Sequence, residues 1–390
     1  MVHQGSVINC LASIAKSLHL SAADILVAVT SICFDIAALE LLLPLSIGVK
    51  VVLAARDLIA SGTNLSILLV SSGATIIQAT PSTYHLLLKA DKELLAKHQL
   101  RKVLCGGEPL SASLAQELLA YPVELFNLYG PTETTIWSSI HQVKETSGNI
   151  AIGPSFANTQ FYILDSHLQP VPIGVPGELH IGGVGVARGY FNRPELTVEK
   201  FIPNPFSTEP GTRLYKTGDL TRYLPDGTIE FLGRTDYQVK LRGFRIELRE
   251  IEMVLNQHPA VRETIVLASE DTSLQKRLVA YVVFHQKQVS TSSELSSFLR
   301  EKLPNPMVPS TFVFLDNLPL TPNNKVNRKA LLDFDCSQPE LEETFLAPRT
   351  PLEHALAEIW SEVLEVKTFG VNDNFFELGG DSILGIQIIS

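Results

Sequence analysis

The segment from Gly233 to Glu252 constrains the fold most, because the residues on its two sides follow different patterns. A turn signal at Leu224 to Thr228 precedes it, and Gln238 to Arg242 alternates apolar and long cationic residues as a strand does. Gly243 interrupts this alternation, and residues 247–257 then place apolar side chains at helical intervals. The pattern predicts a boundary between two domains within this segment.

The same segment carries a cluster of cationic side chains, namely Arg234, Lys240, Arg242, Arg245 and Arg249. The cluster is a local exception, since the whole chain has a formal net charge of −10. It indicates either a negatively charged ligand nearby or a solvated hairpin whose charges pair with local glutamates. The spacing alone favours neither interpretation.

The residues before this segment alternate strand-like and helical runs, which is typical of an α/β domain with a mainly parallel sheet. With 390 residues, 45% of them hydrophobic, the chain can bury the cores of roughly two or three domains. We expect strands over 25–30, 49–53, 74–79 and 102–105, and helices over 34–43, 82–90 and 111–119. From Asn149 onward, Gly and Pro separate short strands, which predicts an antiparallel sheet or distorted barrel with strands at 160–164, 177–181 and 228–232.

The residues after the segment predict a small α+β domain, with helices over 247–257 and 293–303 and strands over 264–268, 278–284 and 312–315. A polar, proline-containing linker follows. Thr350 to Glu353 then has the N-cap, the first-turn proline and the returning glutamate that begin a helix. We therefore divide the chain into residues 1–235, 236–334, 335–348 and 349–390.

Composition excludes several classes of protein. A net charge of −10 without a long Lys/Arg run excludes non-specific nucleic-acid binding. The most apolar run, Leu39 to Ala54, contains Pro44 and Lys50 and is too short to span a bilayer. The four cysteines lack metal-ligand spacing, and the N-terminus lacks a signal-peptide pattern. We expect a cytoplasmic protein that binds neither nucleic acid nor membrane.

Six motifs follow one another along the chain: Asn127–Glu133, Gly177–Tyr190, Tyr215–Leu220, Gly233–Glu252, Leu303–Pro309 and Asn324–Arg328. In this order they resemble the adenylation domains of non-ribosomal peptide synthetases, within the acyl-adenylate-forming superfamily. Residues 373–383 resemble the start of a peptidyl carrier domain. The resemblance covers nearly the whole chain. It implies a partial α/β adenylation core over 1–235, a small α+β C-terminal subdomain over 236–334, a linker over 335–348 and a truncated helical carrier domain over 349–390.

The family couples a carboxylate to ATP, releases pyrophosphate and passes the acyl group of the acyl-AMP to a thiol. The resemblance thus implies ATP or AMP, Mg²⁺ and 4′-phosphopantetheine as cofactors. Its partners would be an amino acid, condensation domains of other modules and a phosphopantetheinyl transferase. The family's phosphate-binding loop should precede Val2, so we expect a fragment that is weakly active or inactive alone. The alternatives are a non-catalytic carrier or docking remnant, and a stand-alone acyl-CoA ligase, which Asp35 and the carrier motif disfavour.

The resemblance assigns nucleotide contacts to residues of these motifs. Glu133 would bind Mg²⁺ through a carboxylate oxygen, although it also suits the first turn of a helix. Asp219 would accept hydrogen bonds from the ribose hydroxyls, although an Asx turn is the plainer interpretation. Tyr129 would stack on adenine, where ordinary packing is the alternative. The further contacts would be Asn127, Gly107 and Glu108 at adenine, Thr132 beside Glu133, and Arg234 at the ribose or α-phosphate.

The resemblance gives two lysines different steps of the reaction. Lys325 would stabilise the charge that develops between the attacking carboxylate and the α-phosphate, although by itself it would be an exposed loop lysine. Lys240 would serve thioester transfer after the small domain rotates about Asp236, which matches the hinge position. Ser382 would carry the phosphopantetheine arm, and its alternative is a plain helix N-cap.

The loop that carries Lys325 departs from the family's pattern. Asn324 stands where the family has Gly, and Asn327 stands where it has Asp. Asn tolerates a left-handed backbone best after Gly, so the loop can form. The missing carboxylate leaves open which residue pairs with Arg328.

Asp35 matches the position at which the family pairs an aspartate with the α-ammonium of an amino acid, and the alternative is a helix N-cap. The other pocket positions match Ile36, Leu39, Gln78, Leu104, Gly106, Leu128, Ile136 and Trp137. Branched aliphatic walls and an indole leave little volume and no charge for a side chain. We therefore predict a small substrate, glycine first and alanine second.

Overall fold

The computed structural model describes residues 1–59, 61–90, 99–146, 148–235, 238–241, 244–270, 276–285, 288, 290–319, 326–332, 346–364, 370–371, 375 and 388. The chain divides into two compact units, Met1–Asp236 and Tyr237–Ser390. Six residues named above, Asp236, Arg242, Gly243, Asn324, Lys325 and Ser382, lie outside the described residues.

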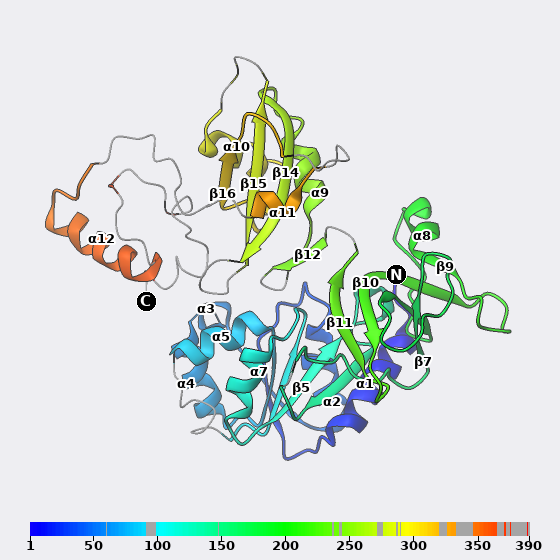
Figure 1. Ribbon diagram of the computed structural model, residues 1–390. Helices are drawn as coiled ribbons and strands as arrows, with labels where there is room; N and C mark the ends of the chain where they lie inside the picture. Colours follow the sequence, from blue (N-terminus) through cyan, green and yellow to red (C-terminus); the bar gives the residue numbers. More distant parts are fainter. Residues whose placement is uncertain are drawn as a thin grey trace. The chain divides into compact units, whose positions relative to one another are not determined.

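A six-stranded sheet forms the centre of the first unit (Figure 1). Its order is β2 (Lys50–Leu53), β1 (Ile25–Ala28), β3 (Ile76–Ala79), β4 (Lys102–Gly106), β5 (Glu124–Tyr129) and β6 (Ser139–Val143). All neighbours are parallel except β5 and β6, so the predicted α/β fold with a mainly parallel sheet is confirmed. Strands β5 and β6 are additional to those that the pattern predicts.

Helices cover both faces of this sheet, which is why β3 and β4 are buried along their whole length. Helices α4 (Gly62–Ser72), α5 (Pro81–Ala90) and α7 (Ala112–Leu119) pack on one face, and α1 (Gln4–Leu18) and α2 (Ala37–Ile47) pack on the other (Figure 1). A short helix, α3 (Arg56–Ile59), follows β2. Successive strand residues enter opposite cores, as Val103 and Leu104 do.

An antiparallel sheet follows in the same unit. Its order is β11 (Ile229–Arg234), β10 (Arg213–Tyr223), β8 (Gly177–Gly183) and β7 (Thr159–Leu164), and β9 (Phe201–Pro203) pairs with β10 after α8 (Pro194–Lys200). The antiparallel sheet predicted after Asn149 is therefore confirmed. Its register places Asp219 opposite Arg234.

The second unit has α+β composition. A hairpin of β12 (Gln238–Leu241) and β13 (Phe244–Glu247) leads into α9 (Leu248–Leu255). A sheet of β14 (Val261–Glu270), β15 (Lys276–Phe284) and β16 (Thr311–Phe314) has α9 and α10 (Ser292–Arg300) packed on one face and α11 (Arg328–Leu332) on the other. Strand β13 is additional to the predicted elements, because it continues the alternation beyond the glycine that the pattern takes as an end.

Helix α12 (Pro351–Leu364) begins as its capping pattern predicts. Glu353 N donates a hydrogen bond to Thr350 Oγ1, and Thr350 N donates to Glu353 Oε2, both at 3.2 Å. Trp360 of this helix contacts Phe375, with ring centroids 5.1 Å apart.

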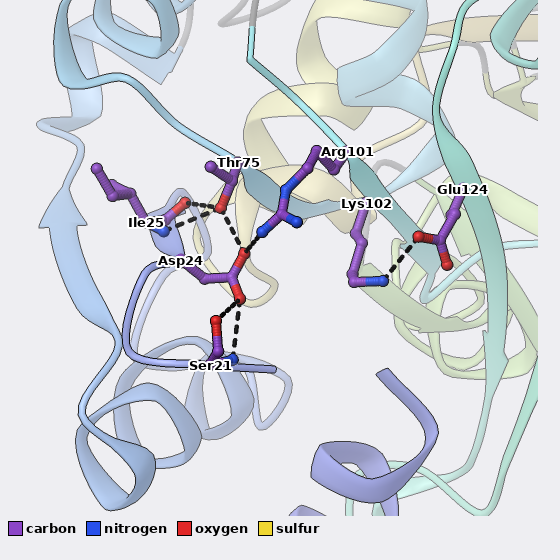
Figure 2. Close-up of polar contacts among 7 residues, drawn as sticks. All are labelled: Ser21, Asp24, Ile25, Thr75, Arg101, Lys102 and Glu124. Atoms are coloured by element: carbon purple, nitrogen blue, oxygen red, sulfur yellow. Dashed lines mark hydrogen bonds and ion pairs between the residues drawn. The ribbon is translucent and has the colours of Figure 1, made fainter. Parts of the chain in front are cut away.

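The amino ends of β1, β3 and β4 meet at one edge of the parallel sheet, where polar side chains surround Asp24 (Figure 2). Asp24 is 1% exposed and accepts hydrogen bonds from Ser21 N and Thr75 Oγ1, both at 2.9 Å, and from Arg101. Burial opposes ionisation, but these donors outweigh it, so the pKa of Asp24 lies below its ordinary value.

An ion pair continues along this edge. Lys102 Nζ at the start of β4 donates to Glu124 Oε1 at the start of β5 over 2.9 Å (Figure 2). The same ammonium lies 5.8 Å from the centre of the Phe126 ring. The amino edge is thus stabilised by charges that pair within the edge itself.

Candidate active site

The opposite edge of the sheet is formed by the carboxyl ends of the parallel strands, where open α/β folds bind their ligands. Gly106 ends β4, and Gly107 follows with a φ of +85°, a conformation that glycine adopts most easily. A Cβ on Gly107 would lie 3.6 Å from the Phe34 ring. Glu108 Oε2 accepts a hydrogen bond from Ser82 Oγ at 2.9 Å. The predicted Gly107 and Glu108 therefore lie beside the segments that follow β1 and β3.

Three of the predicted nucleotide residues contact one another. Tyr129 Oη, at the end of β5, donates to Asp219 Oδ2 at 2.5 Å, and Arg234 Nη1 donates to Asp219 Oδ1 at 2.6 Å. Burial, and then the Asp219 charge, raise the pKa of Tyr129 well above its ordinary value. Asp219 is 5% exposed, and its carboxylate joins the parallel sheet to the antiparallel one. An Asx turn therefore does not account for Asp219.

Asn127 lies deeper than the other predicted adenine contacts. It is 5% exposed, and its Nδ2 donates to Ala151 O at 2.9 Å. In this structure the side chain connects β5 to the segment after β6, so its contact with adenine stays a prediction.

Glu133 lies in η1 (Thr132–Thr134), a single 3₁₀ turn after β5, and Thr132 at its start is exposed. Glu133 is 6% exposed, and its Oε1 accepts a hydrogen bond from Tyr190 Oη at 2.6 Å. Burial, followed by the charges of Tyr215 and Glu133, raises the pKa of Tyr190. A turn of three residues has little helix dipole, so the helix-start interpretation of Glu133 gains no support.

A magnesium ion would fit Glu133 only together with a bound nucleotide. In the described part of the chain, no group of three or more His, Cys, Asp and Glu side chains could enclose a metal. Mg²⁺ is commonly bound by one or two carboxylates together with substrate phosphates. Glu133 therefore suits a protein ligand of an ion that arrives with a nucleotide.

The predicted acyl-pocket residues gather in one place. Six of them belong to the core between the sheet and helices α1 and α2, and none is more than 5% exposed: Ile36, Leu39, Leu104, Leu128, Ile136 and Trp137. Gln78 is fully buried among them, and its Nε2 donates to Ile36 O at 3.1 Å and to Glu40 Oε1 at 2.8 Å. Trp137 Nε1 donates to Gln78 Oε1 at 3.2 Å.

Gly106 lies directly against the indole of Trp137. A Cβ on Gly106 would meet Trp137 Cη2 at 2.5 Å and Leu128 O at 2.8 Å, closer than real atoms approach. The indole therefore fills the space beside the end of β4. A small substrate side chain in this pocket remains a prediction.

The backbone that presents Trp137 is strained. Thr135 and Ile136 have φ angles of 70° and 68°, which β-branched residues rarely adopt. A Cβ on Gly130 would meet Trp137 Cα at 2.5 Å, so the chain passes close to this glycine. Such strain gathers at functional sites because the surrounding structure enforces it.

Asp35 is half-buried in the segment between β1 and α2. The cap position of α2 is Ile36 rather than Asp35, and Ile36 makes no side-chain cap hydrogen bond. The helix-cap interpretation of Asp35 is therefore not supported by the structure.

Comparison with known families accounts for most of the chain. Residues 1–191 match the AMP-binding enzymes, residues 250–325 match their C-terminal domain, and residues 354–390 match the phosphopantetheine attachment site. The chain belongs to the AMP-binding enzyme family. The resemblance that the six motifs indicate is confirmed, as is a fold with a small C-terminal subdomain and a carrier domain.

Relatives of this AMP-binding enzyme are much longer proteins. The dimodular nonribosomal peptide synthase of Bacillus subtilis (strain 168) is 45% identical over 391 residues, 100% of this chain and 16% of that protein. Gramicidin S synthase 2 of Brevibacillus brevis is 42% identical over 370 residues, which are 94% of this chain and 8% of that protein. A crystal structure of a four-domain nonribosomal peptide synthetase bound to AMP and glycine is 41% identical, with a TM-score of 0.57, over 98% of this chain and 28% of that one.

The cationic cluster of this AMP-binding enzyme is divided by the structure. Arg234 belongs to the first unit and pairs with Asp219. Lys240 is half-buried in β12 opposite Arg245, whereas Arg245 and Arg249 are exposed. Their exposure favours the solvated interpretation for Arg245 on β13 and for Arg249 on α9, and an anionic ligand remains the prediction for Arg234 and Lys240.

Arg328 pairs with a glutamate of helix α9. Arg328 Nη2 lies 3.4 Å from Glu252 Oε1 of α9, so a glutamate from another element pairs with this guanidinium. Asn327 Oδ1 accepts a hydrogen bond from Ala330 N at 3.2 Å and so caps the start of α11. Asn327, which stands where the family has Asp, therefore stabilises the start of the helix that follows the loop.

Three supporting residues of this AMP-binding enzyme are additional to the predicted ones, namely Glu40, Gly130 and Tyr190. Gly130 and Tyr190 stand inside the motifs Asn127–Glu133 and Gly177–Tyr190, which was the signal that could have found them. Glu40 has only one sequence signal, because it is an acidic residue within the apolar run from Ile36 to Leu43.

Proposed function

We propose that this chain is part of a non-ribosomal peptide synthetase module that activates a small amino acid as aminoacyl-AMP and loads it on a phosphopantetheine carrier. The observation that carries the proposal is the adjacency of two predicted subsites. On β5, Leu128 of the predicted acyl pocket directly precedes Tyr129 of the predicted nucleotide site. At the end of β4, Gly106 of the acyl pocket likewise precedes Gly107 of the nucleotide site. An acyl group and a nucleotide bound there would meet, as adenylation requires.

The nucleotide residues then take definite roles. Tyr129 offers a ring for adenine, and Asp219 accepts from the ribose hydroxyls while Arg234 neutralises its charge. Asn127, Gly107, Glu108 and Thr132 complete the nucleotide contacts. Mg²⁺ bound between Glu133 and the phosphates would offset their negative charge during the reaction.

The substrate that the pocket supports best is glycine, with alanine second. Asp35 would pair with the α-ammonium of the substrate. Among the buried walls, the indole of Trp137 would occupy the space that a larger substrate side chain needs. The relative whose crystal structure contains AMP and glycine supports this choice at 41% identity.

The later steps rest on the family's motifs, because their residues lie mostly outside the described part of the chain. We propose Lys325 for adenylation, Lys240 for thioester transfer, Asp236 as the hinge and Ser382 as the attachment point of phosphopantetheine. The corresponding domains are residues 1–235, 236–334 and 349–390, with a linker between the last two. Condensation domains and a phosphopantetheinyl transferase are the proposed partners.

The predicted location rests on sequence patterns. Among the described helices, none combines the length and the apolar character needed to cross a bilayer. A cytoplasmic location remains a prediction.

The test is amino-acid-dependent exchange of labelled pyrophosphate into ATP, measured over a panel of amino acids in the protein that carries this sequence. Glycine is expected to give the highest rate and alanine the second highest. Binding of a glycyl-adenylate analogue with a sulfamoyl linkage provides a second measurement that requires no turnover. A preference for an aromatic or charged amino acid would contradict the proposal.

A further inference from the structure

Glu40 lies on α2 behind the predicted acyl wall and has no exposed surface, at 0%. Its Oε1 accepts a hydrogen bond from Gln78 Nε2 at 2.8 Å, and Gln78 Oε1 accepts one from Trp137 Nε1 at 3.2 Å. Two consecutive hydrogen bonds thus connect this carboxylate to the indole that lies against Gly106.

The segment after β1 binds the other side of the same carboxylate. Val29 N and Thr30 N donate to Glu40 Oε2 at 2.8 and 2.9 Å, and Thr30 Oγ1 donates to Oε1. Every one of these partners, like Gln78 Nε2, is a donor. An ionised carboxylate accepts at both oxygens, so it satisfies this set completely.

This set of donors determines which way the Gln78 amide faces. Its NH₂ group is required by Glu40 and by Ile36 O, at 2.8 and 3.1 Å, so its oxygen faces the indole. The indole N–H is a donor only. A reversed amide would place two donors against each other in a buried position, which is costly.

We propose that Glu40 is a specificity-determining positioning residue, which fixes the Gln78 amide and thereby holds the Trp137 indole against Gly106 to keep the acyl pocket shallow. The inference rests on the proposed function for the meaning of the pocket. The hydrogen-bond chain itself does not depend on it.

Glu40→Gln tests this step sharply because it keeps the size of the side chain. Its amide oxygen must stay on the side of Val29 N and Thr30 N, so its NH₂ replaces Oε1. Gln78 must then turn its oxygen toward residue 40, and Trp137 loses its acceptor. Glu40→Asp is the second variant should E40Q fail to fold, because it keeps the charge but withdraws the carboxylate from Gln78.

The first readout is the indole N–H resonance of Trp137, which needs no activity. The chain has two tryptophans, so Trp360→Phe in α12 leaves one indole signal. E40Q is expected to shift this resonance and to accelerate its hydrogen exchange. The second readout is pyrophosphate exchange, in which the rate with alanine relative to glycine is expected to rise about tenfold, the order expected for one methylene in a pocket.

Asp24→Asn is the matched control, since Asp24 is an equally buried carboxylate at the other edge of the same sheet. It is expected to lower stability without moving the indole signal or the alanine-to-glycine ratio. A folded E40Q or E40D variant with an unchanged indole signal overturns the inference. If the indole signal moves but the longer protein that carries this sequence supports exchange with no amino acid, the proposed function fails while the positioning role stands.

Discussion

The two edges of the parallel sheet differ in which partners their polar side chains have. At the amino edge, Asp24 and Lys102 pair with partners on the same edge, and the charges cancel locally (Figure 2). At the carboxyl edge, Asp219 and Glu133 receive hydrogen bonds from Tyr129 and Tyr190 on distant segments, and Gly106 stands where a side chain would overlap Trp137.

The difference separates stability from function within one sheet. Strained backbone occurs at the carboxyl edge, where Thr135 and Ile136 adopt left-handed angles beside the acyl wall. The ion pairs of the amino edge connect the starts of strands instead, β1 with β4 across β3 and β4 with β5. Substitutions at the amino edge should therefore change the free energy of unfolding, and equivalent substitutions at the carboxyl edge should also change activity.

The largest difference in activity between the two edges is expected for substitutions of two glutamates, Glu133 and Glu124. Glu133→Gln should lower kcat/KM for pyrophosphate exchange by about a hundredfold or more, because one preorganised charge contact is lost in the transition state. Glu124→Gln should change it less than about twofold, because Glu124 pairs with the buried Lys102 at the opposite edge of the sheet, where the loss of the pair lowers stability. Binding of Mn²⁺ with ATP, followed by electron paramagnetic resonance, should weaken only in E133Q. Equal losses in the two variants would remove the contrast.

The sequence predicts the parts of the site that depend on local pattern. The strand predicted over 102–105 is an apolar run after Lys102 that stops at a glycine, and the predicted pocket residues follow from their positions in the motifs. Glu40 could not be predicted, because a lone acid in a helical run usually faces water and its donors come from Val29, Thr30 and Gln78. Helix α1 was missed because its apolar residues are interrupted by many small polar ones.

Contacts between distant segments were also beyond the sequence. Tyr190 and Glu133 are 57 positions apart, and Arg328 and Glu252 are 76 apart. Nothing in the local spacing of either residue specifies such a partner. The motifs identify which residues matter, whereas the fold decides which of them touch.

The second contrast concerns two glycines. Gly106→Ala should destabilise the protein by about 1–3 kcal/mol, because the new methyl group overlaps the Trp137 ring and a backbone oxygen. It should also lower exchange with glycine about tenfold, since the indole must move. Gly5→Ala in α1 has open space around it and should stabilise the helix by about 0.5–1 kcal/mol. Urea unfolding and exchange assays distinguish the two, and a harmless G106A would show that the indole is not packed there.

A smaller effect is expected from removing one hydroxyl at each edge. Tyr129→Phe loses the hydrogen bond to Asp219 and should raise KM for ATP about fivefold. A factor of about five corresponds to the roughly 1 kcal/mol that one hydrogen bond contributes. Thr75→Val loses the bond to Asp24 and should cost a similar free energy of unfolding while KM stays the same. A raised KM in T75V would show that the two edges are coupled.

The smallest contrast is in the pH dependence of stability, where the buried carboxylates of the two edges have opposite signs. Hydrogen bonds and Arg101 lower the pKa of Asp24 despite its burial, so its stabilisation is present above the ordinary carboxyl pKa of about 3.9 and is lost as pH falls through the folded value. Burial raises the pKa of Glu40 despite its donors, so its contribution is present below about 4.3 and is lost as pH rises through the folded value.

Urea unfolding of wild type, Asp24→Asn and Glu40→Gln between about pH 3 and pH 8 measures these two signs, a range that brackets ordinary carboxyl pKa values. The stability advantage of wild type over D24N should grow as pH rises from the acid limit, because the wild-type carboxylate then ionises and binds Arg101. The advantage of wild type over E40Q should shrink with rising pH, because ionisation of Glu40 is easier in the unfolded chain. Parallel profiles for the two variants would show that the edges do not differ in this respect.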